Sequence, residues 1–390
     1  MKQQKDWSRR KFVQWMGYTS AIGAVGLPGR WLSASPLAGA PTSPRFAFAG
    51  STGKQHGIQV FSIKNDRWSH VQTIASENPS ALALHPSERF LYAVNEIDSY
   101  QSLPTGTVEA YSIDPHSGRL TLLNRQPLSL SGVLPRHLAV SPDGRTLAVA
   151  VHGGGAYNLL PIGEDGRLDR VSAIIKETGS GPHADQDSAH PQMVVFDRSG
   201  SRLLSADLGS DTLSVLDLND DGLSVASRSQ AAPGSGPRQM ALHPSGNLLY
   251  VVNELDASLS CFGYDATSGS IRQRLHHTAI GSCSASGVAA MAMHPAGNVL
   301  YTSYCGSGAG SLSAWRIDAA SGALKPVRRA ADQASSLQIA SMVAAHDSLF
   351  VLDHKQGILR LPASATSGRL GQPVQVARIE APVSLALKYS

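Results

Sequence analysis

The segment Gly236–Leu255 carries an arginine and a glutamate whose chemistry could be used together. Arg238 follows a Gly-Pro pair, and Glu254 ends an apolar, strand-like run. A guanidinium group can bind a carboxylate or phosphate through two parallel hydrogen bonds, or stabilise an oxyanion. A glutamate whose pKa is brought toward neutrality by burial can accept a proton from water. The two residues could instead form a structural ion pair, so both interpretations stay open at this point.

A second polar group lies between His183 and Gln192. Two histidines, His183 and His190, enclose two aspartates, but their spacing matches no common metal site, so no metal is expected. His190 could accept a proton if its ring reaches the site, whereas Gln192 can donate a hydrogen bond but cannot accept a proton at neutral pH. The glycines at 153–155 read as a loop because no strand-to-helix context follows them, and no cofactor is expected.

Both groups lie inside a repeat that recurs about every fifty residues. Each copy has a tight turn built from proline, glycine and small polar residues, followed by an apolar, β-prone run. Copies begin at His85, Ser141, Asp197, His243 and His294, with a degraded copy near His346 and a first strand, without its turn, at Phe46–Gly50. Internal repetition with this period is typical of propellers and solenoids.

Each copy predicts about four short antiparallel strands. The run after the turn is apolar throughout, as expected for an inner strand that is buried on both faces. A second strand follows with alternating apolar and polar residues, as in Thr107–Ile113 and Leu259–Tyr264, and then a turn such as Asp114–Leu120. Radial repetition hides most strand edges, and no helical stripe is visible. We therefore predict an all-β, seven-bladed β-propeller over residues 41–390.

The composition agrees with a propeller and argues against other classes of protein. The chain has 390 residues with 37 glycines, and only 16% of the residues are charged and 6% aromatic. This balance suits short strands and tight turns rather than a helical bundle or a disordered chain. The formal net charge is +4, and basic residues do not cluster with aromatic ones. Nucleic-acid binding is therefore not expected, although a mildly basic surface could attract an anion.

Residues 1–40 read as a targeting segment and linker. A Ser-Arg-Arg-x-Phe-Val pattern over residues 8–13 precedes a short Gly/Ala-rich apolar stretch that ends near Leu27. These features describe a secretory signal of the twin-arginine type. We expect the twin-arginine translocase as a partner during export and a periplasmic or secreted location. The apolar stretch is too short for a stable membrane span, and cleavage near Ala40 and retention of the signal both stay open.

The three cysteines are Cys261, Cys283 and Cys305. None belongs to a Cys-x-x-Cys pair, so a zinc or iron–sulfur site is not expected. The odd number leaves at least one free thiol. The cysteines could be buried small apolar residues, or Cys283 and Cys305 could form a bridge.

Several of these segments resemble the lactonase family of seven-bladed propellers, which includes bacterial 6-phosphogluconolactonase and fungal carboxy-cis,cis-muconate cyclase. The segment Gly236–Leu255 resembles the family's G-P-R-H and N-E-L motifs. Pro135–Gly144 resembles its P-x-H-L turn, Asp207–Asp211 its D-L-G-x-D motif, and Gly50–Phe61 its first blade. The likeness covers nearly all of the chain after the targeting segment, and it implies a propeller that acts on a lactone.

In that family a histidine, an arginine and a glutamate from adjacent blades are proposed to act near the central channel. The resemblance gives Arg238 and Glu254 two of these roles. The family often reads Q-E-x-P-H-x-H where this chain has Gln186–Gln192, so Gln192 stands in the place of the shared histidine and His190 in that of the less constant one. The implied catalytic residues are Glu254, Arg238 and His190, and the implied substrate-binding residues are Gln192, His137 and Asp207.

Two functional hypotheses follow. The first is an exported hydrolase, similar to 6-phosphogluconolactonase, that opens a sugar lactone; a phosphorylated lactone is less expected outside the cytoplasm. The second is a propeller without turnover that binds an anionic small molecule or a protein partner. Gln192 in place of the family histidine, and Cys305 where the family often has a later arginine, favour the second hypothesis. The fold alone cannot separate the two.

Overall fold

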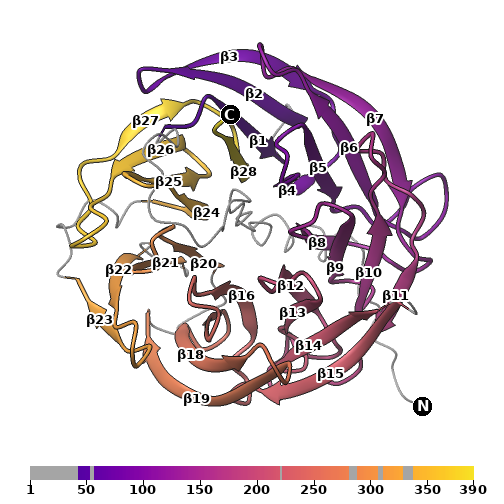
Figure 1. The fold of residues 1–390 in the computed structure, drawn as a ribbon, viewed down its shortest axis with the longest axis vertical. Coiled ribbons are helices and arrows are strands. Elements are labelled where there is room, and N and C mark those ends of the chain that lie inside the picture. Colours follow the sequence, from indigo (N-terminus) through magenta and orange to yellow (C-terminus); the bar gives the residue numbers. More distant parts are fainter. Residues whose placement is uncertain (1–42, 53–56, 220–221, 281–287, 306–310, 328–336) are drawn as a thin grey trace, which may run out of the picture.

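The repeated turn-and-strand segment folds into one blade of a ring (Figure 1). The structure is a computed structural model that describes residues 43–52, 57–219, 222–280, 288–305, 311–327 and 337–390. The described residues form seven four-stranded antiparallel sheets, which confirms the predicted propeller. Within these ranges there is no helix, and so none that is long and apolar enough to span a membrane. The predicted targeting segment and Cys283, with its possible bridge, lie outside the described residues.

Every blade contributes one strand near the ring axis and three strands farther out. The first four blades are β28 (Pro382–Lys388), β1 (Phe46–Ser51), β2 (Gly57–Lys64) and β3 (Arg67–Ile74); β4 (Pro79–Leu84), β5 (Phe90–Asn95), β6 (Thr107–Ile113) and β7 (Leu120–Pro127); β8 (Pro135–Val140), β9 (Thr146–Val151), β10 (Ala156–Pro161) and β11 (Ala173–Lys176); β12 (Pro191–Phe196), β13 (Arg202–Asp207), β14 (Thr212–Asn219) and β15 (Gly222–Gln230).

The remaining three blades follow the same order from the axis outward. They are β16 (Pro237–Leu242), β17 (Leu248–Asn253), β18 (Ser258–Asp265) and β19 (Ser270–Ala279); β20 (Val288–Met293), β21 (Val299–Cys305), β22 (Ser311–Ile317) and β23 (Leu324–Pro326); β24 (Ile339–Ala344), β25 (Ser348–Asp353), β26 (Gly357–Pro362) and β27 (Val374–Ala377).

The two ends of the described chain meet in the first blade. Strand β28 pairs with β1 in antiparallel register, with Phe46 opposite Lys388. The last strand of the fold is therefore the inner strand of the first blade. This pairing closes the ring and covers an edge of β1 that would otherwise be open to another chain.

The prediction that the apolar run after each turn is the inner strand was wrong. That run is the second strand from the axis, as β5 shows, and the inner strand is the segment before the turn, here β4. Inner strands contact one another around the axis, with β4 beside β8 and β28. Strand β5 is nonetheless buried along its whole length, and β6 is largely buried rather than half-exposed. Both strands are apolar because neighbouring blades cover both faces of each sheet.

The histidines that begin the repeat turns connect neighbouring blades. His85 Nε2 lies 3.0 Å from the carbonyl oxygen of Gly144, and His243 Nε2 lies 2.8 Å from that of Gly297. In each case Nδ1 accepts a hydrogen bond from a backbone N–H of its own turn, which leaves Nε2 to donate. These histidines therefore act within the turns, as the sequence indicated, and additionally hold one blade to the next.

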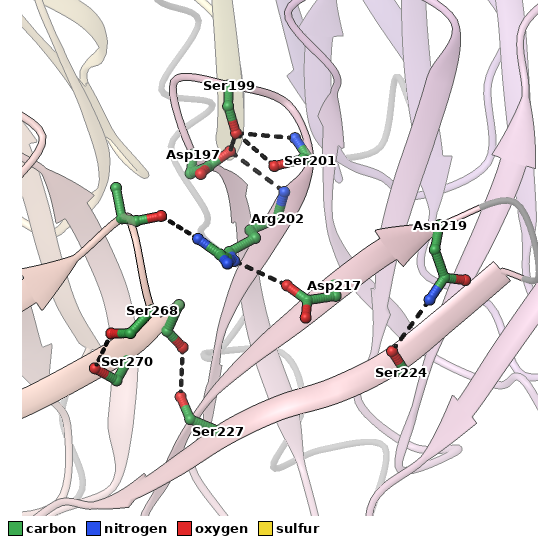
Figure 2. Close-up of polar contacts among 12 residues, drawn as sticks. Asp197, Ser199, Ser201, Arg202, Asp217, Asn219, Ser224, Ser227, Ser268 and Ser270 are labelled. Carbon is green, nitrogen blue, oxygen red and sulfur yellow. Dashed lines mark hydrogen bonds and ion pairs between the residues drawn. The ribbon is translucent and has the colours of Figure 1, made fainter.

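A second contact between blades is made by the Asp-x-x-Ser-Gly turns (Figure 2). Arg202 donates from Nε to Asp217 Oδ1 at 2.8 Å within its own blade, and its guanidinium also reaches the carbonyl oxygens of Ala266 and Thr267 in the next blade. Gly269 in that turn has φ +66°, and a Cβ there would lie 2.5 Å from Arg202 Nε. The turn therefore needs glycine both for its left-handed backbone and for close approach.

The apolar core is divided among the interfaces between blades. One cluster joins Met193 and Leu204 of one blade to Met240 and Leu249 of the next. Cys261 is a free, buried thiol in such a cluster, and burial raises its pKa to about 11. A ring built in this way holds its inner strands rigidly, which is what a site near the axis requires.

Candidate functional site

A β-bulge near the start of the inner strand re-aims one side chain in several of the blades. The register of pairing skips Arg136 in β8, Gln192 in β12 and Arg238 in β16. These three strands are neighbours around the axis. A bulged residue leaves the normal alternation of the strand, so the same small irregularity sets three polar side chains at the same end of three adjacent blades.

The residues that follow the second strands lie beside these bulges. Asn95, Val151 and Asn253 end their strands opposite the first residue of the inner strand in the same blade. The next residues along the chain are Glu96, His152 and Glu254. We call the three bulged residues and these three residues the inner cluster: Glu96, Arg136, His152, Gln192, Arg238 and Glu254.

Arg238 and Glu254, which the sequence singled out, form an ion pair within one blade. Arg238 Nη1 donates to Glu254 Oε2, and the two residues are only 1% and 6% exposed. Removing two charges from water costs several kcal/mol, which their attraction and further hydrogen bonds must offset. The structure therefore brings together the two residues that the resemblance implied as catalytic, in the pairing that the sequence had left open as an alternative.

A second buried pair joins two blades. Arg136 Nε lies 2.9 Å from Glu96 Oε1, and both side chains are 4% exposed. Sequence reasoning did not include these residues among the candidates. The repeat contains the signal, because Asn95-Glu96 occupies the position of Asn253-Glu254, and Arg136 follows a proline as Arg238 does.

His152 is the member of the cluster that sequence reasoning missed most clearly. Its Nδ1 lies 3.2 Å from Gln192 Nε2, and its ring stacks on that of His190 with centroids 4.6 Å apart and an interplanar angle of 27°. Burial holds the pKa of His152 well below its ordinary value, and the positive charges of Arg136, His190 and Arg238 lower it further. His152 is therefore a neutral imidazole beside two guanidinium groups.

His190 is surrounded by acceptors of the protein itself. Its Nε2 lies 2.9 Å from Asp187 Oδ1, and its Nδ1 lies 3.4 Å from the backbone oxygen of His152. The hydrogen bond from His190 lowers the pKa of Asp187. Both ring nitrogens of His190 therefore face protein acceptors, and its ring supports that of His152.

Asp207 holds the loop that carries His190. Its Oδ1 accepts hydrogen bonds from the backbone N–H groups of His190 and Ser210, at 2.9 and 3.0 Å. The side chain is 1% exposed, and burial raises its pKa. These contacts fix the backbone on both sides of the hairpin beside the cluster.

His137 lies in β8, one residue after the bulge, and contacts the next inner strand. Its Nδ1 accepts from the backbone N–H of Val194 in β12 at 3.5 Å, and burial lowers its pKa to about 3. The equivalent residue two blades later, Gln239, accepts from the backbone N–H of Met291 at 2.7 Å. The repeated contact shows that this position braces neighbouring inner strands.

Within the part of the chain that the structure describes, no three His, Cys, Asp or Glu side chains lie together in a way that could hold a metal ion. The inner cluster offers the groups needed for ester hydrolysis instead. It has carboxylates that can take a proton from water, and guanidinium and imidazole N–H groups that can stabilise an oxyanion.

Comparison with known protein families identifies the class of propeller to which this fold belongs. Residues 38–335 match the family model described as Lactonase, 7-bladed beta-propeller. The chain therefore belongs to the lactonase family of seven-bladed β-propellers.

Individual relatives agree with this family assignment. The chain is 30% identical over 280 residues to a 6-phosphogluconolactonase of Formosa agariphila, which covers 69% of this chain and 77% of that protein. It is 30% identical over 224 residues to the 6-phosphogluconolactonase of Bacillus subtilis, covering 57% of this chain and 62% of that one. The fold is also that of the Pseudomonas aeruginosa periplasmic gluconolactonase, with a TM-score of 0.79 at 24% identity over 88% of this chain and 99% of that chain.

Proposed function

We propose that the chain is an exported lactonase that hydrolyses the ring ester of a sugar lactone. The observation that carries this proposal is the inner cluster, in which Arg238 and Glu254 meet beside Gln192 and His152 at the same end of adjacent blades. The family to which the chain belongs, and the lactonase names of its relatives, support the same reaction.

In the proposed reaction, water attacks the carbonyl carbon of the lactone and gives its proton to Glu254. The electrons of the C=O bond move to the carbonyl oxygen, and N–H donors of the cluster stabilise the negative charge. The C=O bond then forms again, the ring C–O bond breaks, and the ring oxygen takes the proton from Glu254, which gives the open hydroxy acid and restores the carboxylate. Arg238 holds the Glu254 carboxylate in place throughout.

Gln192 fits the role of a substrate-binding residue. Its side chain is 2% exposed, and its Oε1 has no hydrogen-bond partner among the described residues. Buried polar groups in native proteins are nearly always paired. A hydroxyl group of a sugar lactone is the kind of donor that would satisfy this oxygen.

The charge of the cluster suits an uncharged lactone better than a phosphorylated one. Arg136 is paired with Glu96 and Arg238 with Glu254, both in buried positions. A phosphate dianion would compete with a glutamate for its arginine and would leave that carboxylate buried without its partner. We therefore propose gluconolactone-like sugar lactones ahead of 6-phosphogluconolactone.

Export is the second part of the proposal. The Arg9–Arg10 pattern and the apolar stretch after it support passage through the twin-arginine translocase, and a structural relative is a periplasmic enzyme by name. The test is to express the full chain with both arginines replaced by lysine. We expect the wild-type chain in the periplasm and the variant in the cytoplasm; equal distribution of the two would contradict export by this route.

The activity is tested by following acid release from gluconolactone and 6-phosphogluconolactone in a pH-stat. The purified chain is compared with Glu254→Gln and Arg238→Ala, with circular dichroism as the control for folding. Loss of a proton acceptor typically lowers the rate about 100-fold or more. If all three proteins give only the spontaneous rate, the hydrolase is overturned in favour of a propeller that binds without turnover.

A further inference from the structure

We infer that His152 donates a hydrogen bond from Nε2 to the carbonyl oxygen of the lactone and so stabilises the oxyanion, an inference that rests on the proposed function. His152 follows β9 in the place that Glu96 and Glu254 occupy in their own blades. The repeat therefore puts an imidazole where two other blades put a carboxylate. The Gln192 side chain, at the place of the family histidine, contacts this imidazole directly.

His152 is the most exposed member of the inner cluster. The other five members are at most 6% exposed, whereas His152 is only partly buried. The two arginines of the cluster, Arg136 and Arg238, each form an ion pair with a glutamate. The imidazole is therefore more accessible to a lactone than either guanidinium group.

The contact with Gln192 determines which ring nitrogen carries the proton. The Gln192 amide nitrogen donates to His152 Nδ1 over 3.2 Å, so Nδ1 is the acceptor and its lone pair is used. A neutral imidazole has one N–H, which is then on Nε2. Nε2 can donate to a substrate oxygen but cannot accept a proton in this tautomer.

The surroundings of the ring keep it neutral and fixed. The nearby guanidinium groups of Arg136 and Arg238 disfavour a positive imidazolium. The ring stacks on His190, which is itself held by Asp187 and by the contact of its backbone with Asp207. A donor that does not move or change charge during the reaction is the arrangement that stabilises an oxyanion most effectively.

Glu254 and His152 have separate roles in the proposed reaction: Glu254 transfers the proton, and His152 stabilises the oxyanion. The proton of the attacking water goes to Glu254, and the carbonyl electrons go to the oxygen that His152 Nε2–H contacts. When the C=O bond forms again, the ring C–O bond breaks and Glu254 gives its proton to the ring oxygen. His152 itself neither gains nor loses a proton.

Two substitutions separate donation from proton transfer. His152→Gln places an amide N–H near the position of Nε2 but cannot accept a proton, and His152→Phe keeps a ring against His190 but removes the donor. Loss of an oxyanion donor typically lowers kcat about 100- to 1000-fold, so we expect such a loss for His152→Phe. We expect less than about a tenfold loss for His152→Gln. The matched control is His116→Phe, which replaces an exposed histidine in an outer turn.

The tautomer is measured independently of activity by nitrogen-15 NMR of the histidine-labelled chain. The signal that disappears in His152→Phe should be a neutral Nε2–H imidazole from pH 6 to pH 9. A protonated or Nδ1–H ring at pH 7 would overturn the inference. So would a wild-type rate with His152→Phe, or equal losses for both variants, while lactone hydrolysis by the wild type stands. An inactive wild-type chain would instead overturn the proposed function, and this inference with it.

Discussion

Replacing His137 by glutamine should make the propeller less sensitive to acid without weakening it at neutral pH. His137 is 3% exposed and its Nδ1 accepts the backbone N–H of Val194. Glutamine occupies the equivalent position in another blade, where Gln239 Oε1 accepts the N–H of Met291. The substitution therefore keeps the acceptor between the inner strands and removes the titrating group.

The magnitude follows from the pKa of His137, which burial lowers from its ordinary value of 6.5 to about 3. Between these two pH values the unfolded chain binds more protons than the folded chain. The contribution of neutral His137 to the unfolding free energy is therefore fully present above pH 6.5, and it is lost as the pH falls toward 3. One pKa unit corresponds to about 1.4 kcal/mol. Between pH 7 and pH 5 this single histidine should therefore cost the wild type about 2 kcal/mol of unfolding free energy.

Urea unfolding of the wild type and His137→Gln at both pH values measures this difference. We expect similar midpoints at pH 7 and a higher midpoint for the variant at pH 5, since the other histidines are common to both proteins. An identical pH dependence would refute the assigned burial and neutrality of His137. The same variant tests the role of the residue: kcat and KM for gluconolactone should change less than about threefold if His137 braces the strands, and a KM raised tenfold would return it to substrate binding.

Three further predictions concern the buried pair and the contacts between blades. Arg238→Ala should lower the unfolding free energy by about 3–5 kcal/mol, because Glu254 is left buried without its partner. In urea unfolding, the double variant Arg238→Met with Glu254→Leu should lose less unfolding free energy than Arg238→Ala. An equal or larger loss in the double variant would contradict the argument that an unpaired buried charge causes the loss. Gly269→Ala should lower the melting temperature because its φ is +66° and its Cβ would meet Arg202, and Arg202→Ala should recover part of the loss; no change would refute the close approach. His243→Ala should cost about 1–2 kcal/mol, because the bond to the neighbouring turn is lost, whereas His116→Ala in an exposed turn should leave the melting temperature unchanged.

The sequence predicted the propeller well because the turns and strands of each blade depend on local residue types, and these repeat along the chain. Turn residues with glycine and proline mark each hairpin, and seven copies of one segment require seven similar units. The strand order within a blade was misjudged, because apolar runs such as Phe90–Asn95 are buried by neighbouring blades and not by closeness to the axis. Burial between two sheets and burial near the axis leave the same apolar pattern in a sequence.

The candidate site was predicted only in part, through the motif that contains Arg238 and Glu254. Arg136 and Glu96 occupy the same repeat positions, yet their pairing joins two blades, and nothing local in the chain indicates that they meet. His152 was overlooked because its neighbours were read as a glycine loop. The bulges that aim Arg136 and Gln192 are also invisible in the sequence, since they are a change of register between two paired strands.

The sequence by itself determined the repeat, its turns and the polar residues available in each copy. Only the tertiary structure decided which of those residues act together. The packing of neighbouring blades places Glu96 beside Arg136, and His152 beside Gln192, although each pair is separated by some forty residues of chain. The physical reason is that contacts between neighbouring blades depend on how whole sheets are positioned around the axis. The burial of many side chains from distant parts of the chain fixes those positions together, so no single segment contains the information.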